Sequence, residues 1–170
     1  MRARFLGLGF ALAVGVGFGC LANPCADGIC ACEDADYCDL DCERDGCEVD
    51  CASIDACDIE CLDDCTVDCE SLTNCDAVCG ANCLFECDSS STCAVSCGAG
   101  CEVECANASS CDAVVGEGSK VSCAQFGSCE VECLGSCELD CGQGGCELSC
   151  ADGADPEDCG DGRWVCAQDC

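Results

Sequence analysis

The chain has 170 residues, of which 31 are cysteine and none is histidine, and its formal net charge is −30 at pH 7. Aromatic residues make up only 4 %, so an ordinary hydrophobic core is excluded and disulfide bonds or metal ions must supplement it. Such a negative surface excludes nucleic acids as ligands and favours cations or basic proteins. Without histidine, Ser-His-Asp and Cys-His catalysis are both excluded, and we expect the protein not to be an enzyme.

Residues 1–19 have the pattern of a signal peptide. The short basic segment 1–4 precedes an uncharged, mostly apolar run over 5–19, which is shorter than a membrane-spanning helix requires. The pattern therefore predicts that the protein is exported from the cytoplasm.

The apolar run ends in Gly17-Phe18-Gly19-Cys20, which resembles the lipobox of bacterial lipoproteins, with Gly17 standing where that family prefers an aliphatic residue. The resemblance implies that Cys20 is lipidated and becomes the N-terminus of a membrane-anchored protein. Leu21 after the cysteine implies, again by resemblance, the outer membrane or the cell surface. Cleavage after Ala22, which would give a periplasmic or secreted protein, and retention of the segment as an uncleaved anchor remain alternatives.

Residues 20–37 are expected to form the lipidated N-terminus, a tether and an N-terminal cap that includes Cys25 to Cys32. Lipidation or cleavage removes Cys20 from the pool of thiols, which leaves 30 of the 31 cysteines. An even number of cysteines in an exported protein is typical of a disulfide framework.

Residues 38–150 repeat with a period of 18, which indicates a repeat architecture. Each unit contains two segments of the form Cys-x-apolar-x-Cys, separated by a gap of three residues, and a gap of five residues leads to the next unit. The period is clearest in one column of cysteines, which comprises Cys57, Cys75, Cys93, Cys111 and Cys129.

The alternation within each segment predicts a short β-strand, because residues i, i+2 and i+4 of a strand point to one face. A helix would place the central apolar residue opposite the cysteines. Two strands per unit, stacked on the next unit, predict an all-β fold: a flattened parallel β-solenoid of about six 18-residue coils, cross-linked by many disulfides. A meander of disulfide-rich antiparallel hairpins is the alternative, although it leaves the cysteine face of the sheet uncovered.

The repeat resembles two known solenoids in its construction. It shares the coil length and the two strands of the calcium-binding β-roll of secreted bacterial toxins, but it lacks the glycine-rich nonapeptides with aspartate that bind calcium there. It is similar to the disulfide-braced solenoid of insect antifreeze proteins, but it has no outward Thr-x-Thr array, so ice binding is not expected. Together with the lipobox, the repeat resembles a bacterial cysteine-rich repeat lipoprotein.

One unit, 111–128, lacks two cysteines at once and thereby indicates which cysteines are partners. Val115 and Ser119 replace both cysteines that flank the three-residue gap, so we expect these two positions to pair with each other. The outer cysteines pair either across the five-residue gap or within a coil, and the spacing does not choose between these. The pairs expected across the shorter gap are Cys42–Cys47, Cys61–Cys65, Cys79–Cys83, Cys97–Cys101 and Cys133–Cys137.

Two metal-binding alternatives stay open. A metallothionein-like thiolate cluster would also use many cysteines, although the sequence holds a single C-x-C, at Cys30-Ala31-Cys32, and no C-x-x-C. Outward carboxylates that stand one coil apart repel one another, and weak Ca²⁺ binding would relieve that repulsion; a solvated acidic face that prevents aggregation is the simpler interpretation. The residues of this ladder are Asp50, Asp68, Glu86, Glu104 and Asp140.

Residues 151–170 break the period and contain the only tryptophan, Trp164. A solenoid end exposes strand edges that need cover, so this segment is expected to be the C-terminal cap. The combined features predict an exported, lipid-anchored, disulfide-rich repeat protein that acts as a structural or interaction module at the bacterial cell surface. Its expected partners are the membrane, through the lipid anchor, and cationic or surface proteins; apart from Ca²⁺, no cofactor is expected.

Overall fold

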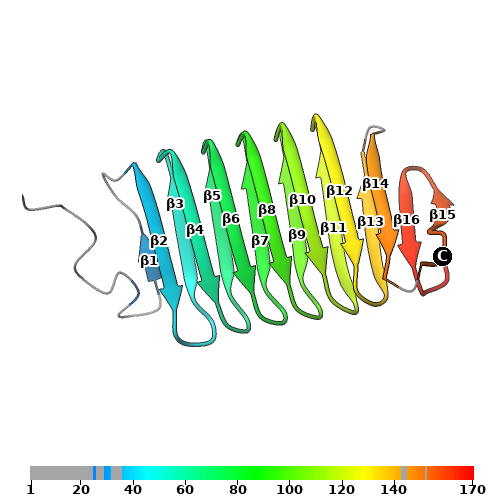
Figure 1. The fold of residues 1–170 in the computed structure, drawn as a ribbon, viewed down its shortest axis with the longest axis horizontal. Helices are drawn as coiled ribbons and strands as arrows, with labels where there is room; N and C mark the ends of the chain where they lie inside the picture. The colour runs from blue at the N-terminus through cyan, green and yellow to red at the C-terminus, as the bar shows by residue number, and fades with distance from the viewer. Residues whose placement is uncertain (1–24, 26–28, 32–35, 143–144, 152) are drawn as a thin grey trace, which may run out of the picture.

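The structure of the protein is a computed structural model, which describes residues 25, 29–31, 36–142, 145–151 and 153–170. The expected signal peptide and the lipidation site Cys20 lie outside these residues. Within the described part of the chain every regular element is a β-strand, and no helix there is long and apolar enough to cross a membrane. The strands build a flat rod of two layers (Figure 1).

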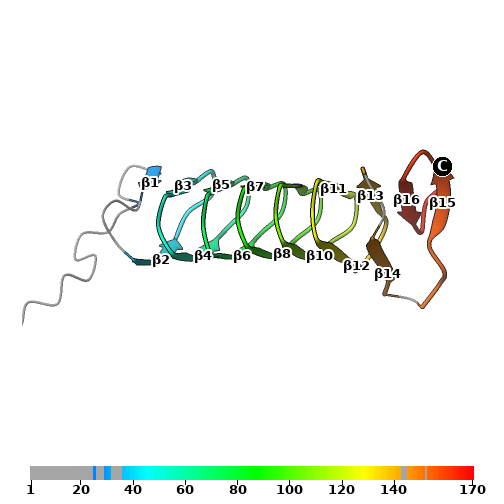
Figure 2. The same cartoon turned by 90° about the horizontal axis from the view of Figure 1, so that it is seen from above.

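One layer of the rod is a nine-stranded sheet, called sheet A, and the other is a seven-stranded sheet, called sheet B. The chain passes from one sheet to the other and back in each coil (Figure 2). Sheet A contains, in spatial order, β1 (Ile29–Ala31), β3 (Glu48–Ala52), β5 (Thr66–Glu70), β7 (Leu84–Asp88), β9 (Glu102–Ala106), β11 (Ser119–Ala124), β13 (Cys137–Cys141), β16 (Arg163–Cys166) and β15 (Glu157–Gly160). Sheet B contains β14 (Cys146–Cys150), β12 (Ser128–Cys133), β10 (Ser110–Val115), β8 (Thr92–Cys97), β6 (Asn74–Cys79), β4 (Ala56–Cys61) and β2 (Tyr37–Cys42).

The strands of the repeat pair in parallel with a register of one sequence period. Cys57 lies beside Cys75, and Cys75 lies beside Cys93, so each cysteine column of the sequence is a column in space. The parallel β-solenoid is therefore confirmed, and the antiparallel meander is wrong for the repeat. The reason is that a two-sheet coil covers the cysteine face, which a single meandering sheet would leave in water.

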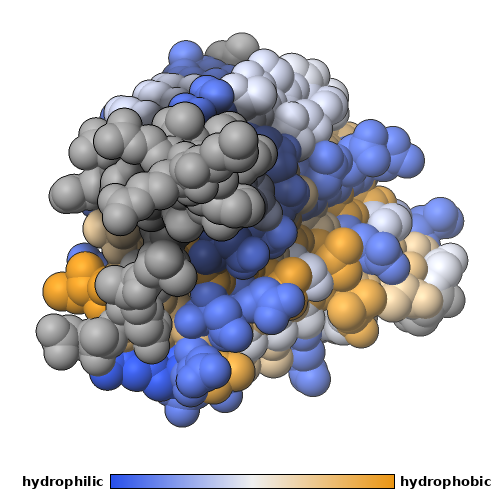
Figure 3. Space-filling model, turned by 60° about the vertical axis from the view of Figure 1, so that its left-hand side comes forward, coloured by the Kyte–Doolittle hydropathy of each residue, from blue (hydrophilic) through white to orange (hydrophobic). Residues whose placement is uncertain are grey.

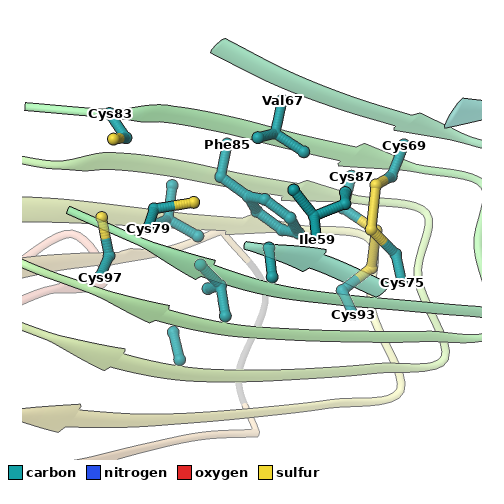
Figure 4. Packing of buried hydrophobic residues seen from close by; sticks show 14 of the residues in the cluster. Ile59, Val67, Cys69, Cys75, Cys79, Cys83, Phe85, Cys87, Cys93 and Cys97 are labelled. Carbon is teal, nitrogen blue, oxygen red and sulfur yellow. A yellow bond between two sulfur atoms is a disulfide. The ribbon is translucent and has the colours of Figure 1, made fainter. Parts of the chain in front are cut away.

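Burial alternates along the strands as the period-2 pattern predicts, with both cysteines and the central residue of each segment inward. Every central apolar residue of the repeat is buried except Leu148 on the last coil, which is partly buried. Phe85 is the largest of the fully buried side chains. Figure 4 shows it packed beside Ile59 and Val67, with disulfide bridges at one edge of the layer. The core therefore consists of two facing columns of apolar side chains, one from each sheet, bordered by sulfur.

The corners of the coils repeat as regularly as the strands. The last residue of the three-residue turn adopts a left-handed conformation in successive coils, as does the second residue of the five-residue turn. The first set comprises Gly46, Asp64, Asn82, Gly100 and Gly118, and the second set comprises Ser53, Ser71, Ser89, Asn107 and Gln125. Small or polar residues at these positions tolerate the left-handed backbone, which lets the chain reverse direction in so few residues. Backbone bonds such as Asp64 N–H to the Ala81 carbonyl, 2.8 Å, continue the ladder around the corner.

Glycines at the first position of the three-residue turn allow adjacent coils to approach closely. A Cβ on Gly98 would lie 2.8 Å from the carbonyl oxygen of Gly80, and one on Gly116 would lie 2.6 Å from the carbonyl carbon of Gly98. Both distances are shorter than real Cβ contacts allow. The glycine column therefore sets the distance between coils at this corner.

Replacement of Gly98 tests this close approach. We expect Gly98→Ala to lower the free energy of unfolding by about 1–3 kcal/mol, because the added methyl group forces the backbone of the neighbouring turn to shift. The measurement is guanidinium denaturation under non-reducing conditions. Ala99→Ser, an exposed substitution in the same turn, is the matched control and leaves the midpoint unchanged. Equal stability of the two variants would contradict the stacking.

The two ends of the rod differ from its middle. At the N-terminal end β1 pairs with β3 in parallel, and a disulfide joins Cys25 to Cys30. At the C-terminal end β16 pairs antiparallel with β13, and β15 pairs antiparallel with β16. The disulfides Cys150–Cys166 and Cys159–Cys170 tie this hairpin to the last coil and close it. The hairpin extends sheet A beyond the last strand of sheet B (Figure 2).

Candidate functional site

A disulfide bond closes each five-residue turn of the central coils. Each bond joins the end of a strand in sheet A to the start of the next strand in sheet B, and the Cα atoms lie 6.3–6.6 Å apart. The outer cysteines of these coils therefore pair across the five-residue turn and not within one coil. Figure 4 shows two of these bridges side by side. The bonded pairs are Cys51–Cys57, Cys69–Cys75, Cys87–Cys93, Cys105–Cys111 and Cys123–Cys129.

At the opposite edge, disulfides cross the three-residue turn in two coils, at Cys97–Cys101 and Cys133–Cys137. Between them lies the coil that has Val115 and Ser119 at the same two positions, and both are buried. The hydroxyl group of Ser119 accepts a hydrogen bond from the Cys101 N–H at 3.1 Å and donates one to the Gly98 carbonyl at 3.3 Å. Its polar atom is thus satisfied without a sulfur partner.

In the three N-terminal coils the same edge holds six buried thiols, so their pairing across the turn stays a prediction. Here the sulfur atoms lie close to those of the next coil: Cys61 Sγ is 3.0 Å from Cys79 Sγ. The Sγ atoms of Cys61, Cys65 and Cys83 all lie within 4.8 Å of one another. We call these residues the thiol stack; it comprises Cys42, Cys47, Cys61, Cys65, Cys79 and Cys83.

The environment of the thiol stack raises the pKa of Cys61, Cys65 and Cys83, so these three thiols are protonated at neutral pH. Burial raises the pKa of Cys65 and that of Cys83 to about 12 in each case. The pKa of Cys61 is raised further, first by its hydrogen bond with Cys79 and then by burial. Both oxidation and metal binding require the thiolate, so both reactions are slower here than at an exposed cysteine.

The acidic ladder that the sequence predicts lies in register along the outer face of sheet A. Asp50 is beside Asp68, Asp68 is beside Glu86, and Glu86 is beside Glu104, whereas Ser122 separates Glu104 from Asp140. The middle of the ladder borders a depression of about 350 Å³, which Glu70 and Asp88 of the next column also line. Burial, followed by repulsion from Asp50 and Asp88, raises the pKa of the Asp68 carboxyl above its usual value.

The raised pKa of Asp68, caused by burial and then by charge repulsion, predicts a pH-dependent stability. A raised carboxyl pKa means that ionisation costs more in the folded protein than in the unfolded chain, so the penalty is present at neutral pH and disappears below the usual carboxyl pKa. We therefore expect Asp68→Asn to raise the melting temperature at pH 7 and to leave it unchanged in strong acid. Glu117→Gln, at an exposed turn, is the control for the loss of one charge. An equal gain in both variants, or a gain that persists in acid, would contradict the prediction.

Sequence reasoning missed a larger depression, of about 490 Å³, on the outer face of sheet B. It spans the strands β6 to β14, and the small residues Ala94 and Ser96 on β8 lie within it. The sequence did carry a signal for this depression, because the outward residues become smaller in one unit. Ala94 and Ser96 stand where the preceding unit has Asp76 and Val78 and where the next unit has Asp112 and Val114. Figure 3 shows hydrophobic patches between hydrophilic residues along the side of the rod.

Comparisons of the chain with protein-family models, curated proteins and solved structures find no match. A function for the protein therefore has to be inferred from the geometry, the sulfur chemistry and the charge of the rod itself.

Proposed function

We propose that the protein is an exported, lipid-anchored scaffold that acts as a structural or interaction module at the bacterial cell surface. The observation that carries this proposal is the disulfide bond at each five-residue turn of the central coils, of which Cys69–Cys75 is one. Such frameworks form and persist in oxidising compartments and are rare in the cytoplasm. The signal peptide expected over residues 1–19 and the lipobox at Cys20 provide the matching route to the cell surface.

The disulfides close the turns through which the chain passes from each coil to the next one. A solenoid is stabilised mainly by contacts between adjacent coils, so a rod of this kind normally frays from its ends. Here the bond at Cys87–Cys93 joins the coil that ends with β7 to the coil that begins with β8. This bond holds the two strand ends together at the turn and lowers the conformational entropy of the unfolded chain, which stabilises the folded coils. A rod with this property suits a scaffold that must keep its surface outside the cell.

The intact mass of the mature protein tests the proposal. We expect about one mass unit less per cysteine than in the reduced chain, which is about 30 for the 30 cysteines other than the lipidated Cys20, together with a diacylglyceryl adduct. This result includes the pairing of the thiol stack. Cys20→Ser is the control: the adduct disappears and the disulfides remain. A mature protein that has mostly free thiols and retains zinc or copper would contradict the scaffold proposal.

Metal binding is a second candidate function, and the close approach of the Sγ atoms of Cys61, Cys65 and Cys83 favours it. Three or four thiolates in such a group are the ligands that Zn²⁺ and Cu⁺ prefer. If the stack binds metal, protein isolated without chelator contains a stoichiometric ion, and Cys61→Ser together with Cys83→Ser removes it. Ala52→Ser, which changes an outward side chain on β3, leaves the metal content unchanged. Metal-free, fully oxidised wild-type protein would exclude this function.

Weak Ca²⁺ binding along the acidic ladder is the other form that metal binding could take. Carboxylate oxygens in register at Asp68, Glu86 and Glu104 are hard ligands, and a divalent cation would relieve their repulsion. If they bind Ca²⁺, millimolar concentrations raise the melting temperature, and a temperature that does not change would remove this candidate.

A further inference from the structure

The depression on the outer face of sheet B, called the β8 groove, combines apolar walls with a rim of carboxylates. Its two central columns run across the strands. One consists of Asp76, Ala94, Asp112, Glu130 and Glu147; the other consists of Val78, Ser96, Val114, Glu132 and Ser149. At β8 both columns carry a small side chain, whereas the strands on either side carry a larger one. The face is therefore hollow over β8 and higher over β6 and β10.

The dimensions of the hollow follow from the strand spacing. β6 and β10 each pair with β8, so they lie about 9–10 Å apart, which leaves the width of one guest side chain between them. Val78 and Val114 face the hollow in one column, and Val78 is 55 % exposed to solvent. Asp76 and Asp112 face it in the other column. A guest in this position has hydrocarbon on one side and two carboxylates on the other.

Both carboxylates are held by a neighbour on their own strand. The side-chain amide of Asn74 donates a hydrogen bond to Asp76, and the hydroxyl group of Ser110 donates one to Asp112 at 3.2 Å. Each bond uses only one carboxylate oxygen, so the other oxygen is available to a ligand. Ordered carboxylates lose less side-chain entropy on binding than mobile ones.

We infer that the β8 groove binds a basic, amphipathic segment of a partner protein. A lysine or arginine side chain matches the hollow: its alkyl stem packs between Val78 and Val114, and its cationic group lies between Asp76 and Asp112. Charge complementarity supports a basic partner, because the chain carries a net charge of −30. A simple metal cation would gain nothing from the valines. The inference rests on the proposed role as an interaction module and specifies its partner.

The length of the groove specifies the spacing of the partner's basic residues. Beyond the hollow, Glu130, Glu132 and Glu147 form a second acidic group on β12 and β14. These strands lie two and three positions from β8, which is about 10–14 Å. An extended segment covers this distance in about four residues and points residues i, i+2 and i+4 to one side. The partner motif is therefore basic-x-apolar-x-basic, with the apolar residue beside Val114.

A binding assay with two peptides tests the inference on the purified, oxidised full-length protein. The probe contains Lys-Ser-Leu-Ser-Lys, and the comparison peptide contains Lys-Ser-Ser-Ser-Lys. We expect the probe to bind more tightly at physiological salt, where diffuse attraction is screened. Two changes should each weaken probe binding about tenfold or more: Ala94→Phe, which fills the hollow, and the pair Asp76→Asn and Asp112→Asn.

Matched controls separate the groove from overall charge. The pair Asp39→Asn and Asp58→Asn removes the same charge from the same outward column outside the groove, and Ala124→Phe adds a ring on sheet A. Both should leave probe binding unchanged. Equal affinity for the two peptides, or equal weakening by both aspartate pairs, would overturn the inference. If Ala94→Phe fails to fold, comparison of the two aspartate pairs still tests the inference.

Failure of this inference is distinguishable from failure of the proposed function. The intact mass can show the full set of disulfides while the protein does not bind the probe. That result overturns the inference about the β8 groove and leaves the scaffold proposal intact. A protein with free thiols and bound metal overturns the scaffold, whatever the peptides do.

Discussion

The disulfide across the five-residue turn is the constraint on which the rest of the molecule depends. Two packed sheets ordinarily lie about 10 Å apart, whereas Cys69 and Cys75 hold their Cα atoms 6.4 Å apart at the edge of the layer. The layer is therefore thin at this edge and accepts only one column of apolar side chains from each sheet between the cysteine columns. This explains why cysteine forms most of the core, with small aliphatic residues such as valine between the cysteine columns, and why a chain with few aromatic residues can still fold.

The covalent framework also explains how the rod tolerates its charge. Parallel strands in register place like residues beside one another, so Asp50, Asp68 and Glu86 stand in one row where they repel. In an ordinary sheet such a row would weaken the pairing of the strands. Here the disulfides across the turns stabilise the folded coils by constraining the unfolded chain, which offsets the repulsion, and the outward charge keeps the rod in solution. The same repeat thus produces both the repulsion between outward carboxylates and the disulfides that offset it.

The two faces of the rod differ because outward residues are under no packing constraint. On sheet A the outward columns are mostly acidic, and on sheet B they change to Ala94 and Ser96 at β8. A pair of small residues in one coil has little effect on folding, but it opens a hollow because the neighbouring coils keep their larger side chains. Function in a repeat protein can therefore depend on a local departure from the repeat, whereas stability depends on the repeat itself.

Much of this architecture could be predicted from residue spacing. The period of 18 places equivalent residues on one column, and the alternation around Ile59 or Val95 places cysteines and apolar groups on one face, so the solenoid and its core follow from the sequence. The joint loss of cysteines at Val115 and Ser119 likewise marks the two positions that face each other across a turn. The tertiary structure alone decided that Cys69 bonds to Cys75, because that choice depends on the distance between the ends of two sheets. It also decided which thiols contact one another between coils and where the surface is hollow, since these depend on neighbours that lie one period or more away along the chain.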